Sequence, residues 1–254
     1  MESPAAQTSQ LAGQWALITG AAKRIGACIA RTLHANGANI VIHYGSSAAA
    51  AEQLAAELNG QRPDSAFVLQ ADLREHTQLV KLVESAVSKT GGLNILVNNA
   101  STFYATPVDE ITLEHWDDLI GTNLKAPLFL AQAAAPHLRA VGGQIINIVD
   151  IHSQRPLRNH SVYGAAKAGL AMLTRSLAKD LAPDIRVNGI SPGAILWPDS
   201  GMSPQSEQSI IRQIPLTRTG EPDDIARTAL FLVKDAPYIT GQIIAVDGGR
   251  SVGW

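Results

Sequence analysis

The chain has 254 residues, and its 20 basic and 22 acidic residues give a formal net charge of −2. No basic run or stripe is present, so nucleic acid and anionic membranes are not expected partners. The single cysteine, Cys28, excludes an internal disulfide and a metal site built from cysteines, and we expect no metal ion. Residues 1–10 are small and polar, and no later run approaches the roughly 20 apolar residues of a membrane span. We therefore expect a flexible tail at 1–10 and a cytoplasmic protein.

Short apolar strands alternate with helical patterns along residues 11–254. The predicted strands cover residues 15–19, 39–43, 66–70, 94–97, 144–149, 185–190 and 242–246. The predicted helices run from Ile25 to Asn36, over residues 48–58, 75–89 and 112–138, from Ser161 to Pro183, and over 221–233. Repeated units of strand and helix predict a single α/β domain with a Rossmann fold, in which helices cover both faces of a doubly wound, parallel, seven-stranded sheet. Such sheets bind ligands at the carboxyl ends of their strands.

A glycine-bearing turn, Gly20 to Gly26, connects the first predicted strand to the first predicted helix. Such a turn directs backbone N–H groups and the positive end of the helix toward an anion, typically a pyrophosphate. A glycine turn alone is a common feature. Here its place between strand and helix predicts a dinucleotide site.

The second strand indicates which dinucleotide is bound. An NAD site normally has an acidic residue here for the ribose 2′-hydroxyl. This strand instead ends in the neutral segment His43-Tyr44-Gly45-Ser46-Ser47. Lys23 and Arg24 lie in the facing turn, and this combination can hold a 2′-phosphate, so we expect NADPH as the cofactor. The alternative is that both basic side chains are only solvated.

Polar residues follow three more of the predicted strands. Asp72-Leu73 comes after the third strand, where an adenine ring would lie. The segment 98–101 follows the fourth strand, and Asp150 follows the fifth. Because the strands are predicted to be parallel, these residues should meet at one edge of the sheet.

The long predicted helix over 112–138 contains Pro127, which has no N–H to donate to the carbonyl of Asn123. In an ordinary helix this costs stability, whereas beside an active site the free carbonyl can bind an ordered water. We favour the second interpretation and expect Asn123 to lie near Lys167.

Tyr163 and Lys167 are four residues apart in the next predicted helix, so they share one face, about 5–6 Å apart at Cβ. A free tyrosine titrates near pKa ~10 and is a poor acid or base at neutral pH, so a neighbouring ammonium is the simplest way to tune it. The pair is typical of a tyrosine proton donor whose pKa is adjusted by a neighbouring lysine. The alternative is a half-buried tyrosine beside a solvated lysine.

Residues 197–206, with Trp197, are loop-forming and predict a lid over the site.

Taken together, five segments resemble the short-chain dehydrogenase/reductase family over almost the whole chain. They are Thr19-Gly20 to Gly26, Asn98-Asn99-Ala100, Asn123, Tyr163 with Lys167, and Pro192-Gly193. Each segment alone is common, whereas the ordered set is specific.

Three positions depart from the usual pattern of that family. Arg24 and Ser101 stand in place of glycines, and Asp150 stands in place of the catalytic serine. The same three departures are found in pteridine reductases, so the sequence resembles a bacterial pteridine reductase within the family.

This resemblance implies NADPH-dependent reduction of dihydropteridines, dihydrofolate or oxidised pterins by a homotetramer. The catalytic residues that it implies are Asn123, Asp150, Tyr163 and Lys167. Phe103 matches the residue that stacks on the pterin, which would lie between the phenyl ring and the nicotinamide. The implied substrate site comprises Arg24, Ser101, Phe103, Asp150, Tyr163 and Trp197. The implied cofactor site comprises Gly20, Lys23, Arg24, Ile25, His43, Tyr44, Ser46, Ser47, Asp72, Leu73, Asn99, Ala100, Ser101, Thr122, Tyr163, Lys167, Pro192, Gly193 and Ile195. Protozoan members have a basic residue at the position of Ser46, and its absence leaves the 2′-phosphate to Lys23, His43 and Ser47.

The aspartate beside the tyrosine supports a reductase for ring nitrogens. A serine at position 150 would stabilise a phenolate, whereas the charge of Asp150 opposes it, so Tyr163 and Asp150 should titrate as a coupled pair. The tyrosine then stays protonated and can deliver a proton to a ring nitrogen after hydride has reached the adjacent carbon.

Two alternatives remain open. A carbonyl reductase for ketones or 3-oxoacyl thioesters would share the fold and cofactor, and Asp150 and Phe103 are the residues that argue against it. A non-catalytic NADP or pterin sensor would not need the proton-transfer residues Tyr163, Lys167 and Asn123.

Overall fold

The computed structural model describes residues 11–196 and 201–252. Their strands form one seven-stranded sheet in the order β3-β2-β1-β4-β5-β6-β7, and every neighbouring pair is parallel. The predicted α/β fold with a doubly wound, parallel sheet is therefore confirmed. The prediction of a flexible tail falls on residues 1–10, outside the described residues. The strands are β1 (Trp15–Ile18), β2 (Asn39–Tyr44), β3 (Ala66–Gln70), β4 (Ile95–Asn98), β5 (Gln144–Ile148), β6 (Arg186–Pro192) and β7 (Ile243–Val246).

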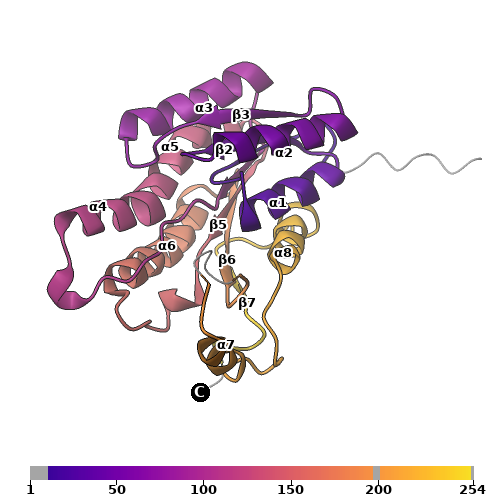
Figure 1. Cartoon of the computed structure of the whole chain (residues 1–254). Coiled ribbons are helices and arrows are strands. Elements are labelled where there is room, and N and C mark those ends of the chain that lie inside the picture. Colours follow the sequence, from indigo (N-terminus) through magenta and orange to yellow (C-terminus); the bar gives the residue numbers. More distant parts are fainter. Residues whose placement is uncertain (1–10, 197–200, 253–254) are drawn as a thin grey trace, which may run out of the picture.

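The central strands are apolar on both faces because both faces are covered by helices (Figure 1). Leu17 of β1 pairs with Val41 on one side and with Leu96 on the other, and all three side chains are fully buried. Parallel sheets with two covered faces have such continuous apolar strands. This explains why short apolar runs, rather than alternating patterns, predict the strands here.

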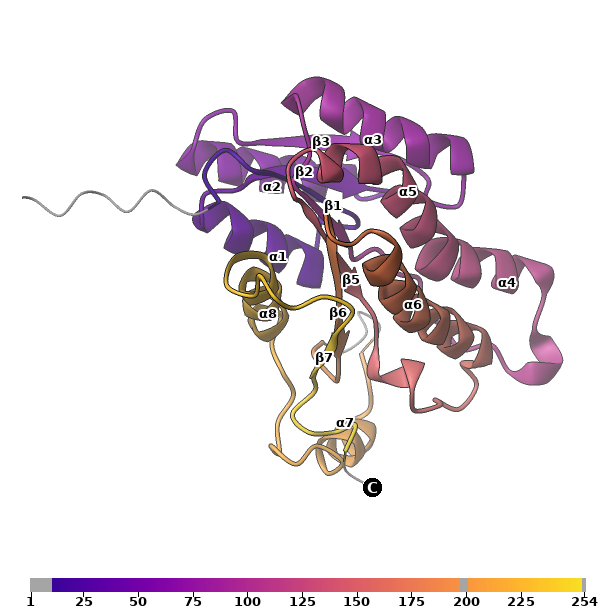
Figure 2. The ribbon, with the colours of Figure 1, turned by 180° about the vertical axis from the view of Figure 1, so that it is seen from behind.

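Helices α1, α2 and α8 pack on one face of the sheet, and α3 and α5 pack on the other, with α6 beside them (Figure 2). Leu58 of α2 and Leu232 of α8 belong to the first core, and Leu82 of α3 and Leu130 of α5 belong to the second. The helices are α1 (Arg24–Ala35), α2 (Ala48–Gln61), α3 (His76–Thr90), α4 (Leu113–Ile120), α5 (Ala126–Arg139), α6 (Ser161–Asp180), α7 (Pro204–Ile211) and α8 (Pro222–Lys234). None of the described helices combines the length and apolar character that a bilayer span requires.

The long helix predicted over 112–138 is interrupted. A π-helical turn, η2 (Gly121–Lys125), separates α4 from α5, and the N–H of Ala126 donates to the carbonyl of Gly121, five residues back. The irregularity predicted near Asn123 is therefore confirmed, whereas the prediction of a single long helix is wrong, because the π-turn divides it in two. The physical reason is Pro127, whose missing N–H prevents a regular ladder at Asn123.

The lid predicted over 197–206 is only partly a loop. Helix α7 begins at Pro204, and the side chain of Ser203 caps it by accepting from the N–H of Ser206. A serine before a proline at the first helical position is a common helix start, and the prediction of a loop missed it. Trp197 lies outside the described residues.

Candidate active site

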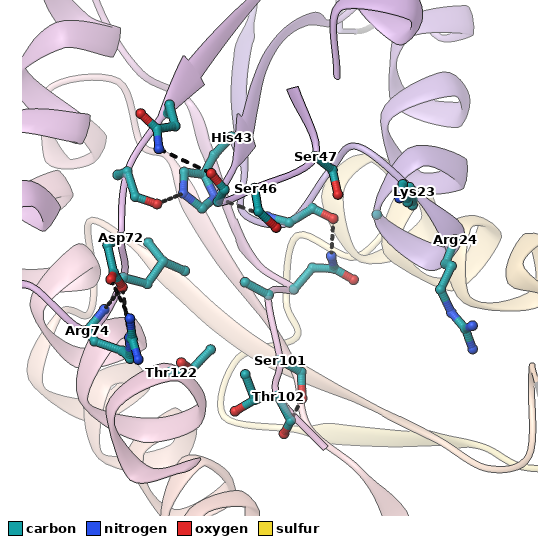
Figure 3. Close-up of a pocket in the computed structure, with 18 of the residues that line it drawn as sticks. Lys23, Arg24, His43, Ser46, Ser47, Asp72, Arg74, Ser101, Thr102 and Thr122 are labelled. Atoms are coloured by element: carbon teal, nitrogen blue, oxygen red, sulfur yellow. Dashed lines mark hydrogen bonds and ion pairs between the residues drawn. The ribbon is translucent and has the colours of Figure 1, made fainter. Parts of the chain in front are cut away.

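A cavity of about 710 Å³ opens at the carboxyl ends of β1 to β4 (Figure 3). Chain order along the sheet reverses between β1 and β4, and dinucleotides bind at such switch points in other sheets of this kind. The cavity size falls in the usual range for small-molecule sites, ~300–1,000 Å³. Most residues predicted for the cofactor line it: Gly20, Lys23, Arg24, Ile25, His43, Ser46, Ser47, Asp72, Leu73, Asn99, Ala100, Ser101 and Thr122.

The glycine turn after β1 packs directly against the loop after β4. Gly20 has a φ of +61°, and a Cβ at this position would lie 2.9 Å from the Cα of Ala100. The side-chain amide of Asn99 donates to the carbonyls of Thr19 at 2.8 Å and Gly20 at 3.1 Å. Only glycine combines this conformation with this close approach. The turn is thereby held in one shape, with the first residues of α1 on the cavity wall.

His43 holds this turn in place, and its predicted contact with the 2′-phosphate stays a prediction. The N–H of Gly20 donates to Nδ1 of His43 at 3.1 Å, and Nε2 lies 3.1 Å from the carbonyl of Ala71. Burial lowers the pKa of His43 to about 4, so the ring is neutral at pH 7. With both ring nitrogens bonded to backbone groups, the side chain fixes the turn and carries no charge for a phosphate.

The basic residues of the turn lie at one end of the cavity, near Ser46 and Ser47 (Figure 3). Lys23 and Arg24 are both exposed there. Arg24 is the first residue of α1 and has a φ of +53°, the left-handed conformation that disfavours any side chain. Such strain typically persists at functional sites and costs about 1–3 kcal/mol. An arginine kept at a position that suits glycine indicates that its guanidinium has a use.

Asp72, which the sequence predicts for the cofactor site, lies at the opposite end of the cavity with Arg74, which sequence reasoning missed (Figure 3). Arg74 donates to the Asp72 carboxylate from Nε at 3.1 Å and from an amino group at 2.8 Å, and these bonds hold the pKa of Asp72 below its usual range. Arg74 also lies 4.0 Å from Asp118 of α4, which accepts a hydrogen bond from the Tyr104 hydroxyl at 3.1 Å. Arg74 could have been identified from the sequence, because it follows Asp72 by two residues on the same loop. No sequence signal indicated Asp118, because its position depends on how α4 packs.

Several residues predicted for the cofactor do not line the cavity. Tyr44 packs against the core on the α1 face of the sheet, and Ile195 is buried in the same core. Pro192 ends β6, and Gly193 packs against Asp247, where a Cβ would lie 2.6 Å from the aspartate Cβ. The assignment of Tyr44 and Ile195 to the cofactor site stays a prediction.

Tyr163 and Asp150 are joined directly, next to this cavity. The Tyr163 hydroxyl donates to Oδ2 of Asp150 at 2.7 Å, and Oδ1 of Asp150 accepts from the N–H of His152 at 2.8 Å. Burial, the charge of Asp150 and this hydrogen bond raise the pKa of Tyr163 far above its ordinary value, while the Ser101 hydroxyl acts in the opposite direction. The phenol therefore remains protonated at physiological pH.

Lys167 is buried below this pair and is only 2% exposed. Its Nζ donates to the carbonyl of Ile148 at 3.0 Å and lies 5.7 Å from the centroid of the Tyr163 ring. Burial lowers the pKa of Lys167 to about 8, against the opposing charge of Asp150. The lysine therefore shares a face with Tyr163, as the four-residue spacing predicts. The dominant influences on the tyrosine are burial and Asp150 rather than the ammonium.

Asn123 connects the π-helical turn to the cavity wall. Its Oδ1 accepts from the Ser101 hydroxyl at 2.6 Å, and its Nδ2 donates to the carbonyls of Thr102 at 3.0 Å and Leu119 at 2.9 Å. Helix α6 packs on this turn so closely that a Cβ at Gly169 would lie 2.8 Å from a methyl of Leu124. The π-turn thus lies between Ser101 and the helix that carries Tyr163 and Lys167.

The Phe103 side chain is 50% exposed and lies next to Tyr163. Its ring meets Tyr163 in a T-shaped contact with centroids 4.8 Å apart. A large exposed aromatic ring beside a buried proton donor can bind a flat ligand by stacking. Among the described residues, no group of three or more His, Cys, Asp or Glu side chains is placed to hold a metal ion.

Comparison with known proteins agrees with this geometry. A family model described as enoyl-(acyl carrier protein) reductase matches residues 20–251. Pteridine reductase 1 of Leishmania tarentolae is 38% identical over 278 residues, covering 93% of this chain and 96% of the relative. A 3-oxoacyl-[acyl-carrier-protein] reductase of Staphylococcus aureus is 37% identical over 238 residues, covering 92% and 96%. An uncharacterized oxidoreductase of Methylorubrum extorquens is 37% identical over 247 residues, covering 95% and 99%. The fold, the site and these relatives together show that the chain belongs to the short-chain dehydrogenase/reductase family of oxidoreductases.

Proposed function

We propose that this chain is an NADPH-dependent pteridine reductase that acts on a dihydropteridine, dihydrofolate or an oxidised pterin. The observation that carries the proposal is the 2.7 Å hydrogen bond from Tyr163 to Asp150. A carboxylate in this place keeps the phenol protonated, which suits donation to a basic ring nitrogen. The similarity to a relative named pteridine reductase 1 supports the same substrate class.

The cavity residues fit a phosphorylated dinucleotide. The glycine turn has no room for a side chain at Gly20, and both Gly20 and Gly26 line the cavity there. Lys23, Arg24, Ser46 and Ser47 would hold the phosphates, and no acidic residue stands at the end of β2. When bound, the reduced nicotinamide supplies a hydride.

The remaining chemistry falls to the side chains of this chain. The Tyr163 O–H bond breaks as an N–H bond forms on the substrate, and before this step the Asp150 carboxylate accepts the hydrogen bond of the phenol. The buried Lys167 ammonium offsets the negative charge that develops on the phenol oxygen. Asn123 keeps Ser101 and the π-turn in place around them.

A carbonyl reductase for ketones or 3-oxoacyl thioesters is the second candidate. It is supported by the relative of Staphylococcus aureus, whose identity is nearly the same as that of the pteridine reductase. Carbonyl reduction uses a neutral hydroxyl to bind the carbonyl oxygen, and Asp150 occupies that place here. A non-catalytic sensor is a weaker candidate, because a sensor does not need a buried lysine beside a tyrosine–aspartate pair.

The proposal is tested by following NADPH oxidation with dihydrobiopterin and dihydrofolate, with NADH as the alternative cofactor. We expect turnover with the pterins and a higher kcat/KM for NADPH than for NADH. Pterin binding that shifts the melting temperature without NADPH oxidation would support the sensor instead.

Arg24→Gly is expected to raise the KM for NADPH about tenfold or more, because a charge-assisted contact to the cofactor is lost. Its folding stability should change little, since glycine adopts the φ of +53° that strains the arginine. Asp64→Gly is a matched control, because Asp64 has a φ of +57° and lies outside the cavity lining. An unchanged KM for NADPH would show that the Arg24 side chain is not used.

The rate with saturating pterin is expected to fall as the pH rises through about 8. Burial lowers the pKa of Lys167 to about 8, so its compensating charge is lost above this pH. A profile of kcat against pH checks this. A rate that stays constant up to pH ~10 would contradict a charged role for Lys167.

A homotetramer and a cytoplasmic location also remain proposals. The exposed apolar side chains Leu113, Trp116 and Met172 on α4 and α6, which are 82%, 47% and 60% exposed, support an assembly through these helices.

A further inference from the structure

His160 stacks on the ring of Phe103. The two ring centroids are 4.7 Å apart and the planes are inclined by only 21°. Tyr163 meets the same phenyl ring in a T-shaped contact at 4.8 Å and 75°. One face of Phe103 is therefore covered by the imidazole, while the side chain as a whole remains 50% exposed.

The imidazole is itself held in place. His160 immediately precedes α6, and its Nδ1 lies 2.7 Å from the carbonyl of Arg158. The two loops that carry the rings are joined beside them, because the N–H of Thr106 donates to the carbonyl of Asn159 at 2.6 Å. Thr106 is fully buried, so the Phe103 side of this junction is anchored in the protein interior. These hydrogen bonds fix the loops that carry His160 and Phe103 relative to each other.

We propose that His160 is a positioning residue of the substrate site, and that its imidazole backs Phe103 so that the phenyl ring presents its other face as a fixed platform for the flat ring of the pterin. This inference rests on the proposed function. A ring that is already ordered loses less conformational entropy when a ligand stacks on it, which strengthens binding without a contact from His160 to the ligand.

The stack predicts a specific pattern of kinetics. His160→Ala should raise the KM for dihydrobiopterin about fivefold, with a smaller effect on kcat and no change in the dissociation constant of NADPH. His160→Phe should restore the KM, because it supplies another flat ring. His76→Ala is the matched control, since His76 also contacts a phenylalanine ring, that of Phe129 between α3 and α5, in a T-shaped pair with centroids 4.5 Å apart. The control should leave both constants unchanged.

Two kinetic outcomes would overturn the proposal. An unchanged KM in His160→Ala would show that the imidazole does not order Phe103 for binding. A lower KM in this variant would show that the imidazole occupies the face that the pterin needs.

A measurement without substrate separates this inference from the proposed function. The imidazole proton resonances of His160, assigned by their loss in His160→Phe, should show a ring-current shift that disappears in Phe103→Leu. If the wild type shows this shift but neither binds nor reduces pterins, the proposed function fails while the ring stack stands. If the wild type reduces pterins and the resonances do not respond to Phe103→Leu, the inference fails and the function stands.

Discussion

Asp150→Ala is expected to lower pterin turnover by about 10²–10³-fold while the dissociation constant of NADPH stays nearly unchanged. The carboxylate accepts the Tyr163 hydroxyl at 2.7 Å and keeps the phenol protonated. Without it the tyrosine loses its partner, and general acid catalysis typically contributes 10²–10⁴-fold. Steady-state kinetics with dihydrobiopterin and a fluorescence titration with NADPH measure the two quantities.

Two further substitutions test whether the loss of turnover is specific to the carboxylate of Asp150. Asp150→Ser restores the residue that is usual in the family, and we expect it to lose pterin turnover and gain activity with simple ketones. Asp117→Ala removes an exposed carboxylate from α4 and should change neither constant. Pterin turnover that is unchanged in Asp150→Ala would make this aspartate structural.

Lys167→Met is expected to lower kcat by at least about 100-fold and to stabilise the fold at the same time. The pKa of this lysine falls from its ordinary 10.5 to about 8 on burial, which corresponds to about 3 kcal/mol of cost for the buried charge at neutral pH. Loss of the hydrogen bond to Ile148 offsets about 1 kcal/mol of the stability gained when this buried charge is removed. The methionine keeps a similar volume, so we expect a net gain of about 2 kcal/mol in the free energy of unfolding.

The pH dependence of stability provides a second test of the same variant. Between pH about 8 and 10.5, the unfolded chain binds more protons at Lys167 than the folded chain does. The wild type therefore gains stability with rising pH in this window, and the difference from Lys167→Met should narrow. Urea unfolding at pH 7 and pH 9.5 measures this difference. A variant less stable than the wild type at pH 7 would contradict the burial argument.

The fold was predictable because its signals are local. Each buried strand is a short apolar run, such as Trp15 to Ile18, and each is followed by a turn or polar residues at the same edge of the sheet. Pro127 signalled an irregular helix near Asn123, although the form of the irregularity, a π-turn beginning at Gly121, depends on packing against α6. The start of α7 at Pro204 was missed because the prediction weighted proline and serine as loop residues.

The sequence was sufficient to identify the main residues of the candidate site, but not their hydrogen-bond partners. Tyr163, Lys167 and Asp150 were identified from spacing and position, and the structure brings them together. The role of His43 was not predictable, because the direction of its ring follows from the glycine turn above it. Arg74 was missed because its hydrogen bonds to Asp72 depend on the conformation of the loop after β3. Such partners are set by the tertiary arrangement of separate loops.

The most direct test of the proposed function is a competition in one reaction. NADPH is supplied with equal concentrations of dihydrobiopterin and an acetoacetyl thioester, and both products are quantified while less than about a tenth of either substrate is consumed. The ratio of products gives the ratio of the two kcat/KM values, independent of protein concentration. We predict that tetrahydrobiopterin is the dominant product, by at least about 100-fold. Dominant formation of the 3-hydroxyacyl thioester would leave the fold and family intact and would contradict the assignment of Asp150 and Phe103 to pterin reduction.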